Sequence, residues 1–137
     1  MAWMIDKCCI TNKSCHLIVE AKEKTLDTKE ITDSIENTET ICESDKFDVN
    51  VCKCKHCRQV YISCFKEYNM ANGEDDYWSF WIPVTAEDIQ NMKKADILIK
   101  FMGELVAGHS SICWGASGKV DWQEGGHPLA YLIFLPI

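Results

Sequence analysis

The strongest constraint on the fold is the stretch of residues 51–61, which reads VCKCKHCRQVY. Three cysteines and a histidine lie within six of its residues, and β-branched or aromatic residues stand on both sides. The run at 47–52 alternates apolar and polar residues, and the run at 59–65 is rich in strand formers. We therefore expect an antiparallel hairpin whose turn holds a metal ion, that is, a zinc-knuckle hairpin.

Cys54 and Cys57 are the first pair of candidate metal ligands. Two intervening residues allow a tight turn to bring both thiolates within about 2.3 Å of one zinc ion while backbone amides point at the sulfurs. Basic side chains around the pair favour the thiolate form. These are Lys53, Lys55 and Arg58.

A structural zinc site takes four ligands, so a second pair is needed. A small N-terminal cluster of cysteines flanks another turn, and from it we predict Cys9 and Cys15 as the second pair. Four further residues are substitutes for this pair: Cys8, His16, Cys42 and Cys52. Cys64 and Cys113 stand inside apolar runs and are expected to be buried core thiols.

The arrangement over about residues 8–65 resembles a zinc ribbon, a family in which two ligand-bearing turns on paired hairpins clamp one metal ion. The resemblance is carried by the segment Cys54-Lys55-His56-Cys57-Arg58 followed by a strand. Two features depart from the family: Arg58 stands where a glycine is common, and the chain has no clean second Cys-x-x-Cys pair. Zinc ribbons occur in many unrelated proteins, so the resemblance implies a module and no activity.

Other readings of the cysteines remain open. Two alternatives to zinc binding exist for Cys54 and Cys57. They could be reduced thiols without a metal ion, or they could be a redox pair, which requires the start of a helix within a βαβ unit. Cys113 and His109 are four residues apart and form the one candidate nucleophile and base, but no third orienting group is fixed by spacing. The alternative function is thus a cysteine-dependent enzyme or redox protein, or a zinc-ribbon adaptor in a larger assembly.

The length of 137 residues and the ordinary globular composition predict a single domain over residues 1–137. Its start has no basic and apolar signal sequence, and the longest apolar run, 129–137, is about half of the roughly 20 residues that cross a bilayer. We therefore expect a soluble cytoplasmic protein without a membrane partner. In that reducing compartment the nine cysteines should not form disulfides.

The net charge of −7 is concentrated in one segment. Residues 20–48 contain ten acidic and four basic residues, whereas the rest of the chain contains eleven acidic and ten basic residues. We expect one acidic face, which disfavours nucleic acid and steers a basic protein partner toward it.

The predicted fold class is α+β, an antiparallel sheet with two helices. A strand is expected at 15–20 and a capping box at Asp27 predicts a short acidic helix at about 28–38. In the second part of the chain, over about 77–137, a strand at 77–84 precedes one long helix at about 86–106, which Thr85 caps and Gly108 ends. A hairpin at 112–122 follows.

The aromatic residues of the 77–84 strand raise the question of a binding surface. Trp78, Phe80 and Trp81 cannot all face one side of a strand, so either both faces are covered or one ring lies in a surface groove. Exposed aromatic rings beside acidic residues are typical anchors for a protein partner. The leading hypothesis is a non-enzymatic, zinc-stabilised protein-binding domain, of the immunity or inhibitor type that caps a basic toxin or nuclease.

Overall fold

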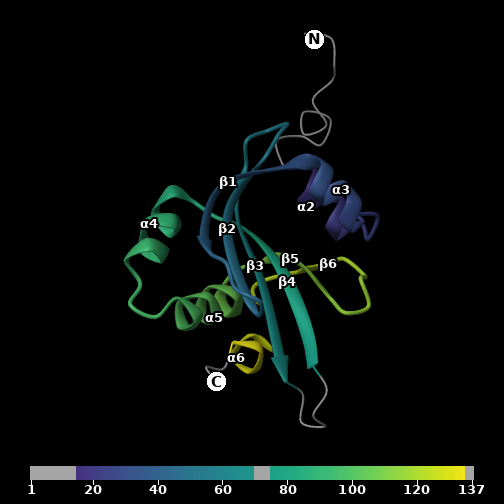
Figure 1. The fold of residues 1–137 in the computed structure, drawn as a ribbon. Coiled ribbons are helices and arrows are strands. Elements are labelled where there is room, and N and C mark those ends of the chain that lie inside the picture. The colour runs from purple at the N-terminus through teal and green to yellow at the C-terminus, as the bar shows by residue number, and fades with distance from the viewer. Residues whose placement is uncertain (1–14, 70–74, 135–137) are drawn as a thin grey trace.

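The computed structural model describes residues 15–69 and 75–134, and its centre is one antiparallel sheet (Figure 1). Six strands lie in the order in which they occur in the chain, and each pairs antiparallel with the next. The strands are β1 (Ile35–Cys42), β2 (Phe47–Cys54), β3 (Val60–Asn69), β4 (Asp75–Pro83), β5 (Ser111–Gly115) and β6 (Asp121–Gln123). This meander needs only short connections, except for the helical segment between β4 and β5.

Helices cover both faces of the sheet (Figure 1). One face carries α2 (His16–Lys22) and α3 (Thr28–Ser34), and the other carries α4 (Ala86–Lys94), α5 (Leu98–Gly108) and α6 (Ala130–Ile133). The predicted α+β class is confirmed. Within the described residues, no helix has the length and apolar character needed to span a bilayer.

The sheet separates two hydrophobic cores because alternate residues of a strand face opposite sides. Phe80 and Ile82 of β4 pack with residues of α4, α5 and α6, whereas Trp81 packs with Tyr61 and the N-terminal helices. The first of the two alternatives for the aromatic strand is therefore largely correct: both faces are covered near residues 80–82.

The predicted hairpin at the cysteine-rich segment is confirmed. β2 and β3 pair in register from Phe47 opposite Lys66 to Lys53 opposite Val60, and the turn of residues 55–59 joins them. The hairpin that follows Gly108 is also present as β5 and β6.

The expected single helix at 86–106 is wrong in one respect, because it is two helices. Thr85 caps the start of α4 as expected, and it forms a full capping box with Asp88, but the backbone of Ala95 is extended and α4 ends at Lys94. A continuous helix would not place Met92 and Leu98, six residues apart, on one face, because one turn takes 3.6 residues. After the break, Met102 and Val106 of α5 are buried in the same core as Met92 of α4.

Two N-terminal expectations also need correction. The segment at 15–20 is a helix, α2, because Leu17 and Ala21, four residues apart, are both buried against the sheet. The acidic helix expected at 28–38 starts with the predicted Asp27 cap but ends at Ser34. The chain then continues as the edge strand β1, whose pairing with β2 replaces the last helical turn.

The glycines near α5 give a test of this packing. A Cβ atom on Gly126 would lie 1.9 Å from the carbonyl oxygen of Ala107, and its φ is +128°, whereas a Cβ atom on Gly108 would contact nothing within 4 Å. Gly126→Ala should lower the free energy of unfolding by roughly 3 kcal/mol, from backbone strain plus overpacking. Gly108→Ala should raise it by about 0.5–1 kcal/mol. Urea denaturation of both variants measures the two effects, and the same sign for both would contradict the described packing.

Candidate metal centre

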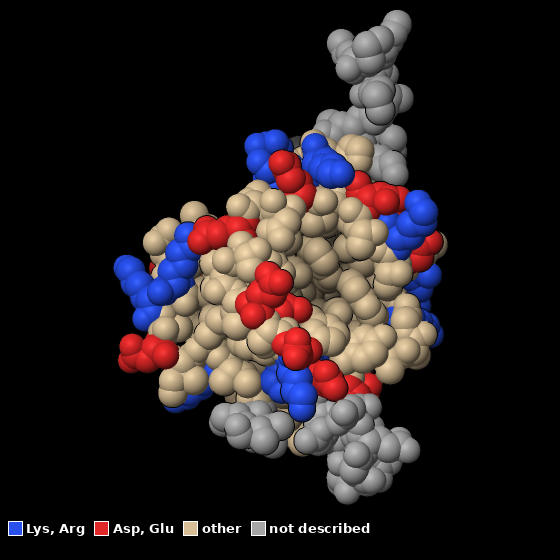
Figure 2. Space-filling model, in the orientation of Figure 1, with Lys and Arg blue, Asp and Glu red and all other residues tan. Residues whose placement is uncertain are grey.

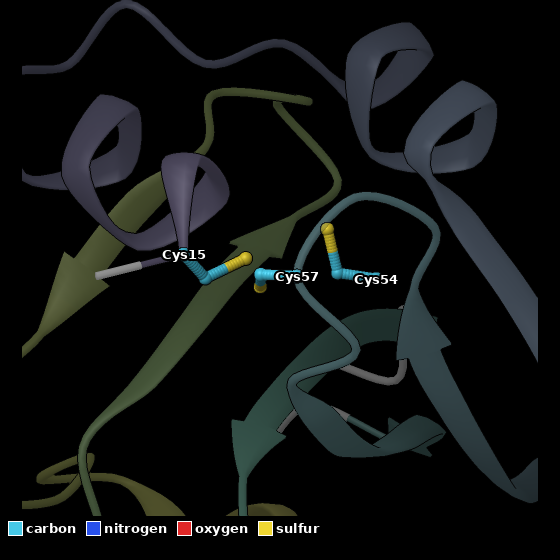
Figure 3. A group of neighbouring side chains, drawn as sticks. All are labelled: Cys15, Cys54 and Cys57. Atoms are coloured by element: carbon cyan, nitrogen blue, oxygen red, sulfur yellow. The ribbon is translucent and has the colours of Figure 1, made fainter. Parts of the chain in front are cut away.

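Three cysteines from two distant segments meet at one end of the sheet (Figure 3). Cys15 immediately precedes α2, Cys54 ends β2, and Cys57 lies in the turn before β3. Their sulfur atoms all lie within 4.8 Å of one another. The sulfur atoms of a tetrahedral zinc site are about 3.8 Å apart at Zn–S distances of about 2.3 Å, so a movement of at most about 1 Å would close this group around an ion.

The turn of residues 54–59 has the backbone geometry of a metal-binding knuckle. Cys54 donates its N–H to the Gln59 carbonyl at 2.9 Å and accepts from the Arg58 N–H at 2.9 Å. The His56 N–H points back and donates to Cys54 Sγ at 3.4 Å. An amide that donates to sulfur favours the thiolate, which is the form that binds metal.

Hydrogen bonding and burial bring the N-terminal helices to this turn. Lys55 N–H donates to the Ser34 carbonyl at 2.8 Å, which joins the end of α3 to the knuckle. Leu17 and Ile31 are almost fully buried in the same small core as Cys15 and Cys54. The position of Cys15 therefore follows from the docking of α2 and α3 on the sheet.

Cys15 lies beside Cys54 and the buried hydroxyl of Tyr61, and on balance these surroundings raise its pKa. A hydrogen bond with Cys54 and burial raise the pKa of the Cys15 thiol, whereas the Tyr61 hydroxyl, which favours the thiolate, lowers it. That hydroxyl is completely buried and makes no well-formed hydrogen bond with any residue in the described part of the chain. A metal-bound thiolate at Cys15 would give it a strong acceptor, because metal coordination removes the thiol proton.

A second group of polar side chains lies next to the thiols. His16 is 1% exposed, and its Nδ1 lies 4.0 Å from Cys54 Sγ. Its Nε2 lies 3.2 Å from Glu30 Oε1 and 3.2 Å from Ser34 Oγ. Glu20 is also near, since His16, Glu20 and Glu30 offer ligand atoms within 4.8 Å of one another. A buried imidazole is thus held between an acidic pair and the cysteine group.

The structure brings together three of the four predicted ligands. Cys54, Cys57 and Cys15 form the group, and Cys9 lies outside the described residues, as does its substitute Cys8. Of the other substitutes, His16 lies beside the group, and the structure does not bring Cys42 or Cys52 into it.

Glu30, Ser34 and Tyr61 surround the group, although no pattern in the sequence indicates that they belong to a site. Glu30 was visible only as part of a helix cap, and nothing in the spacing indicated that it faces His16.

Cys113 and His109, the candidate nucleophile and base, line different cavities. Burial, with a smaller contribution from Asp121, raises the pKa of Cys113 to about 11, so its thiol stays protonated near neutral pH. The ring of His109 donates its Nδ1–H to the Leu105 carbonyl at 3.2 Å. Neither side chain is arranged to activate the other.

Comparison of the chain with protein-family models, with curated proteins and with solved structures gave no match. The likeness to a zinc ribbon therefore depends on the knuckle itself. The rest of the site differs from a zinc ribbon, because Cys15 lies at the start of a helix and a zinc ribbon would have a second hairpin turn there.

Arg58 gives a test of the knuckle geometry. Its φ is +69°, the left-handed conformation that glycine adopts at no steric cost, which explains why glycine is common at this position of the motif. Arg58→Gly should raise the free energy of unfolding by about 0.5–1 kcal/mol. The substitution relieves backbone strain in the folded chain, and the greater entropy of the unfolded chain offsets part of that gain. Arg58→Ala is the matched control, since it removes the charge but keeps the Cβ atom. Equal stabilisation by both in urea denaturation would assign the effect to charge instead of backbone strain.

Proposed function

We propose that Cys15, Cys54 and Cys57 hold a structural zinc ion, and that the chain is a non-enzymatic cytoplasmic domain that binds another protein. The meeting of three thiols from segments separated by almost forty residues is the observation that carries the zinc part of the proposal. Soft thiolate ligands in a tetrahedral arrangement favour zinc over calcium or magnesium.

The burial of the group supports a structural role over a catalytic one. Cys15 and Cys54 are 4% and 0% exposed, and only Cys57 of the three is exposed. A catalytic zinc site keeps one open position for water or substrate, whereas a structural site is closed by protein ligands. The ion would tie the start of α2 to the β2–β3 turn and so fix the helices on this face of the sheet.

Zinc content and stability together test this part of the proposal. The full chain, purified from cells supplied with zinc, should contain one zinc ion per chain, and Cys54→Ser and Cys57→Ser should each lose it. Each variant should also lose several kcal/mol of stability in urea denaturation. In small zinc modules the free energy of zinc binding is on the order of 10 kcal/mol, and it contributes directly to folding.

Cys42→Ser is the matched control. Cys42 is half-buried, its sulfur contacts the Phe47 carbonyl at 3.6 Å, and it is not a member of the thiol group. This variant should keep both the zinc ion and the stability. Loss of metal in Cys42→Ser, or an unchanged zinc content when Cys54 and Cys57 are both replaced, would refute the proposed centre.

An aromatic surface supports the protein-binding part of the proposal. Phe65, Tyr77, Trp81 and Trp114 project from β3, β4 and β5 on one face of the sheet, and all four are only half-buried. The rings of Phe65 and Tyr77 are 5.5 Å apart, and those of Trp81 and Trp114 stack at 6.5 Å. Rigid aromatic rings of this kind dominate the binding energy of protein interfaces.

Acidic side chains lie next to this aromatic surface. Asp48 stands opposite Phe65 in the β2–β3 ladder, and Glu43 and Asp45 are exposed in the preceding turn, where neither pairs with a base among the described residues. On the face shown in Figure 2, acidic side chains occupy the middle as well as the edge, whereas the basic ones lie toward the periphery. Such a surface suits a basic partner, because opposite charges accelerate encounter and suppress wrong partners.

The proposed class is an immunity or inhibitor protein that caps a basic toxin or nuclease. Aromatic anchors beside acidic groups can cover a cationic active site by contact alone. The protonated Cys113 thiol and the separate location of His109 agree with a role that needs no nucleophile.

Charge reversal tests the partner surface. The full chain immobilised in a lysate of its native host should retain one basic protein in equimolar amount, and retention should weaken with rising salt. Glu43→Lys combined with Asp45→Lys should weaken binding of that purified protein by at least about tenfold.

The control pair is Asp96→Lys with Glu104→Lys, which makes the same charge change on the face that carries α4 and α5. It should bind as the native chain does. The same loss of affinity with both pairs, or retention of no basic protein, would refute an acidic docking surface at this position.

A further inference from the structure

We infer that His16 completes the metal centre as its fourth ligand, through Nδ1, and that Glu30 is the residue that positions it. This inference rests on the proposed structural zinc ion and adds the composition of the site, three cysteines and one histidine. The fourth ligand is then His16, which the structure describes, instead of Cys9, which was predicted from the sequence.

The orientation of the His16 ring supports this assignment. Nδ1 lies on the side of Cys54, 4.0 Å from its Sγ, and Cys54 belongs to the thiol group. In a tetrahedral zinc site a ligand nitrogen and a ligand sulfur are about 3.5 Å apart, given Zn–N of about 2.0 Å and Zn–S of about 2.3 Å. A shift of about 0.5 Å therefore separates this pair from the spacing in a loaded site.

The hydrogen bonds of the opposite ring nitrogen set the tautomer. Nε2 lies 3.2 Å from Glu30 Oε1, and a carboxylate can only accept a hydrogen bond. Nε2 therefore carries the proton, and in the neutral ring the lone pair is on Nδ1, on the side of Cys54 Sγ. Zinc-ligating histidines ordinarily donate their second ring N–H to a carboxylate or carbonyl in this way.

Glu30 is itself held in place. Ser34 Oγ lies 3.4 Å from Glu30 Oε1 and 3.2 Å from His16 Nε2, so the three groups form a closed triangle of polar contacts. The Ser34 carbonyl also accepts from Lys55 N–H of the knuckle at 2.8 Å. α3 thus connects the positioning carboxylate to the same turn that carries Cys54 and Cys57.

His56 is the competing imidazole. Its ring contacts that of His16 edge to face with centroids 5.1 Å apart, but its side chain is half-exposed and its backbone amide already donates to Cys54 Sγ. Its chemistry matches that of His16, which makes His56→Asn the matched control for His16→Asn.

X-ray absorption at the zinc edge on the full zinc-loaded chain tests the ligand count. The native chain should give three sulfur ligands at about 2.3 Å and one nitrogen ligand at about 2.0 Å. His56→Asn should leave this shell unchanged, whereas His16→Asn should lose the nitrogen. Four sulfur ligands in the native chain would overturn the inference and indicate a further cysteine such as Cys9. Loss of nitrogen in His56→Asn alone would overturn it in favour of His56.

Failure of the inference and failure of the zinc proposal give different results. A chain that binds no zinc refutes the zinc proposal, whereas a zinc-loaded chain with another ligand set refutes only the assignment of His16. The native spectrum decides the ligand count even where His16→Asn does not fold.

Glu30→Gln tests the positioning role. It should weaken zinc affinity by about 10–100-fold in competition with a chelator while the three-sulfur, one-nitrogen shell is kept. Glu36→Gln is the control. It removes the same charge from an exposed residue of β1 that lies near Lys53 of β2. Equal zinc affinities of Glu30→Gln and the native chain would refute the positioning role.

Discussion

The attachment of residues 15–34 to the β2–β3 turn is the constraint on which this structure depends. α2 and α3 have seven residues each, and helices of that length are not stable in water without tertiary contacts. Their core against the sheet is small, built around Leu17, Ile31 and Tyr61. A metal ion at Cys15 and the knuckle would add a strong, directional link where the hydrophobic contribution is limited. Without that link, one face of the sheet would lose its only helical cover among the described residues.

The thiol group and the aromatic surface share one face of the sheet, and this would link stability to the proposed binding. Tyr61 adjoins the thiol group, and Phe65 lies four residues further along β3 on the same side, beyond the part that α2 and α3 cover. Trp81 and Trp114 pack against the core that these helices form, whereas Phe65 and Tyr77 are not part of it and stay partly exposed. An ion that fixes α2 and α3 would therefore also define the border of the proposed docking surface.

Short sequence patterns predicted the features of the fold that depend on neighbouring residues, such as turns and helix starts. The Cys54–Cys57 spacing indicated the hairpin turn, Thr85 indicated the start of α4, and the departure at Arg58 corresponds to a backbone with positive φ. The break after Lys94 was missed because residues 95–97 contain no glycine or proline that would mark the end of a helix. The approach of His16 to Glu30 was also beyond prediction, since it depends on how two helices dock. Cys15 was named as a ligand from cysteine clustering alone, although the strand expected there is a helix.

The charge of the proposed centre explains why an imidazole suits the fourth position. Four thiolates around a zinc ion carry a net charge of −2, whereas three thiolates and a neutral imidazole carry −1. Cys54 and His16 are almost fully buried, and an uncompensated charge is costly to bury. The Glu30 carboxylate lies on the far side of the His16 ring, so a more negative centre would also repel it. The bases beside the knuckle, Lys53, Lys55 and Arg58, can offset a charge of −1 from the solvent side, and the buried side of the centre needs no further cation.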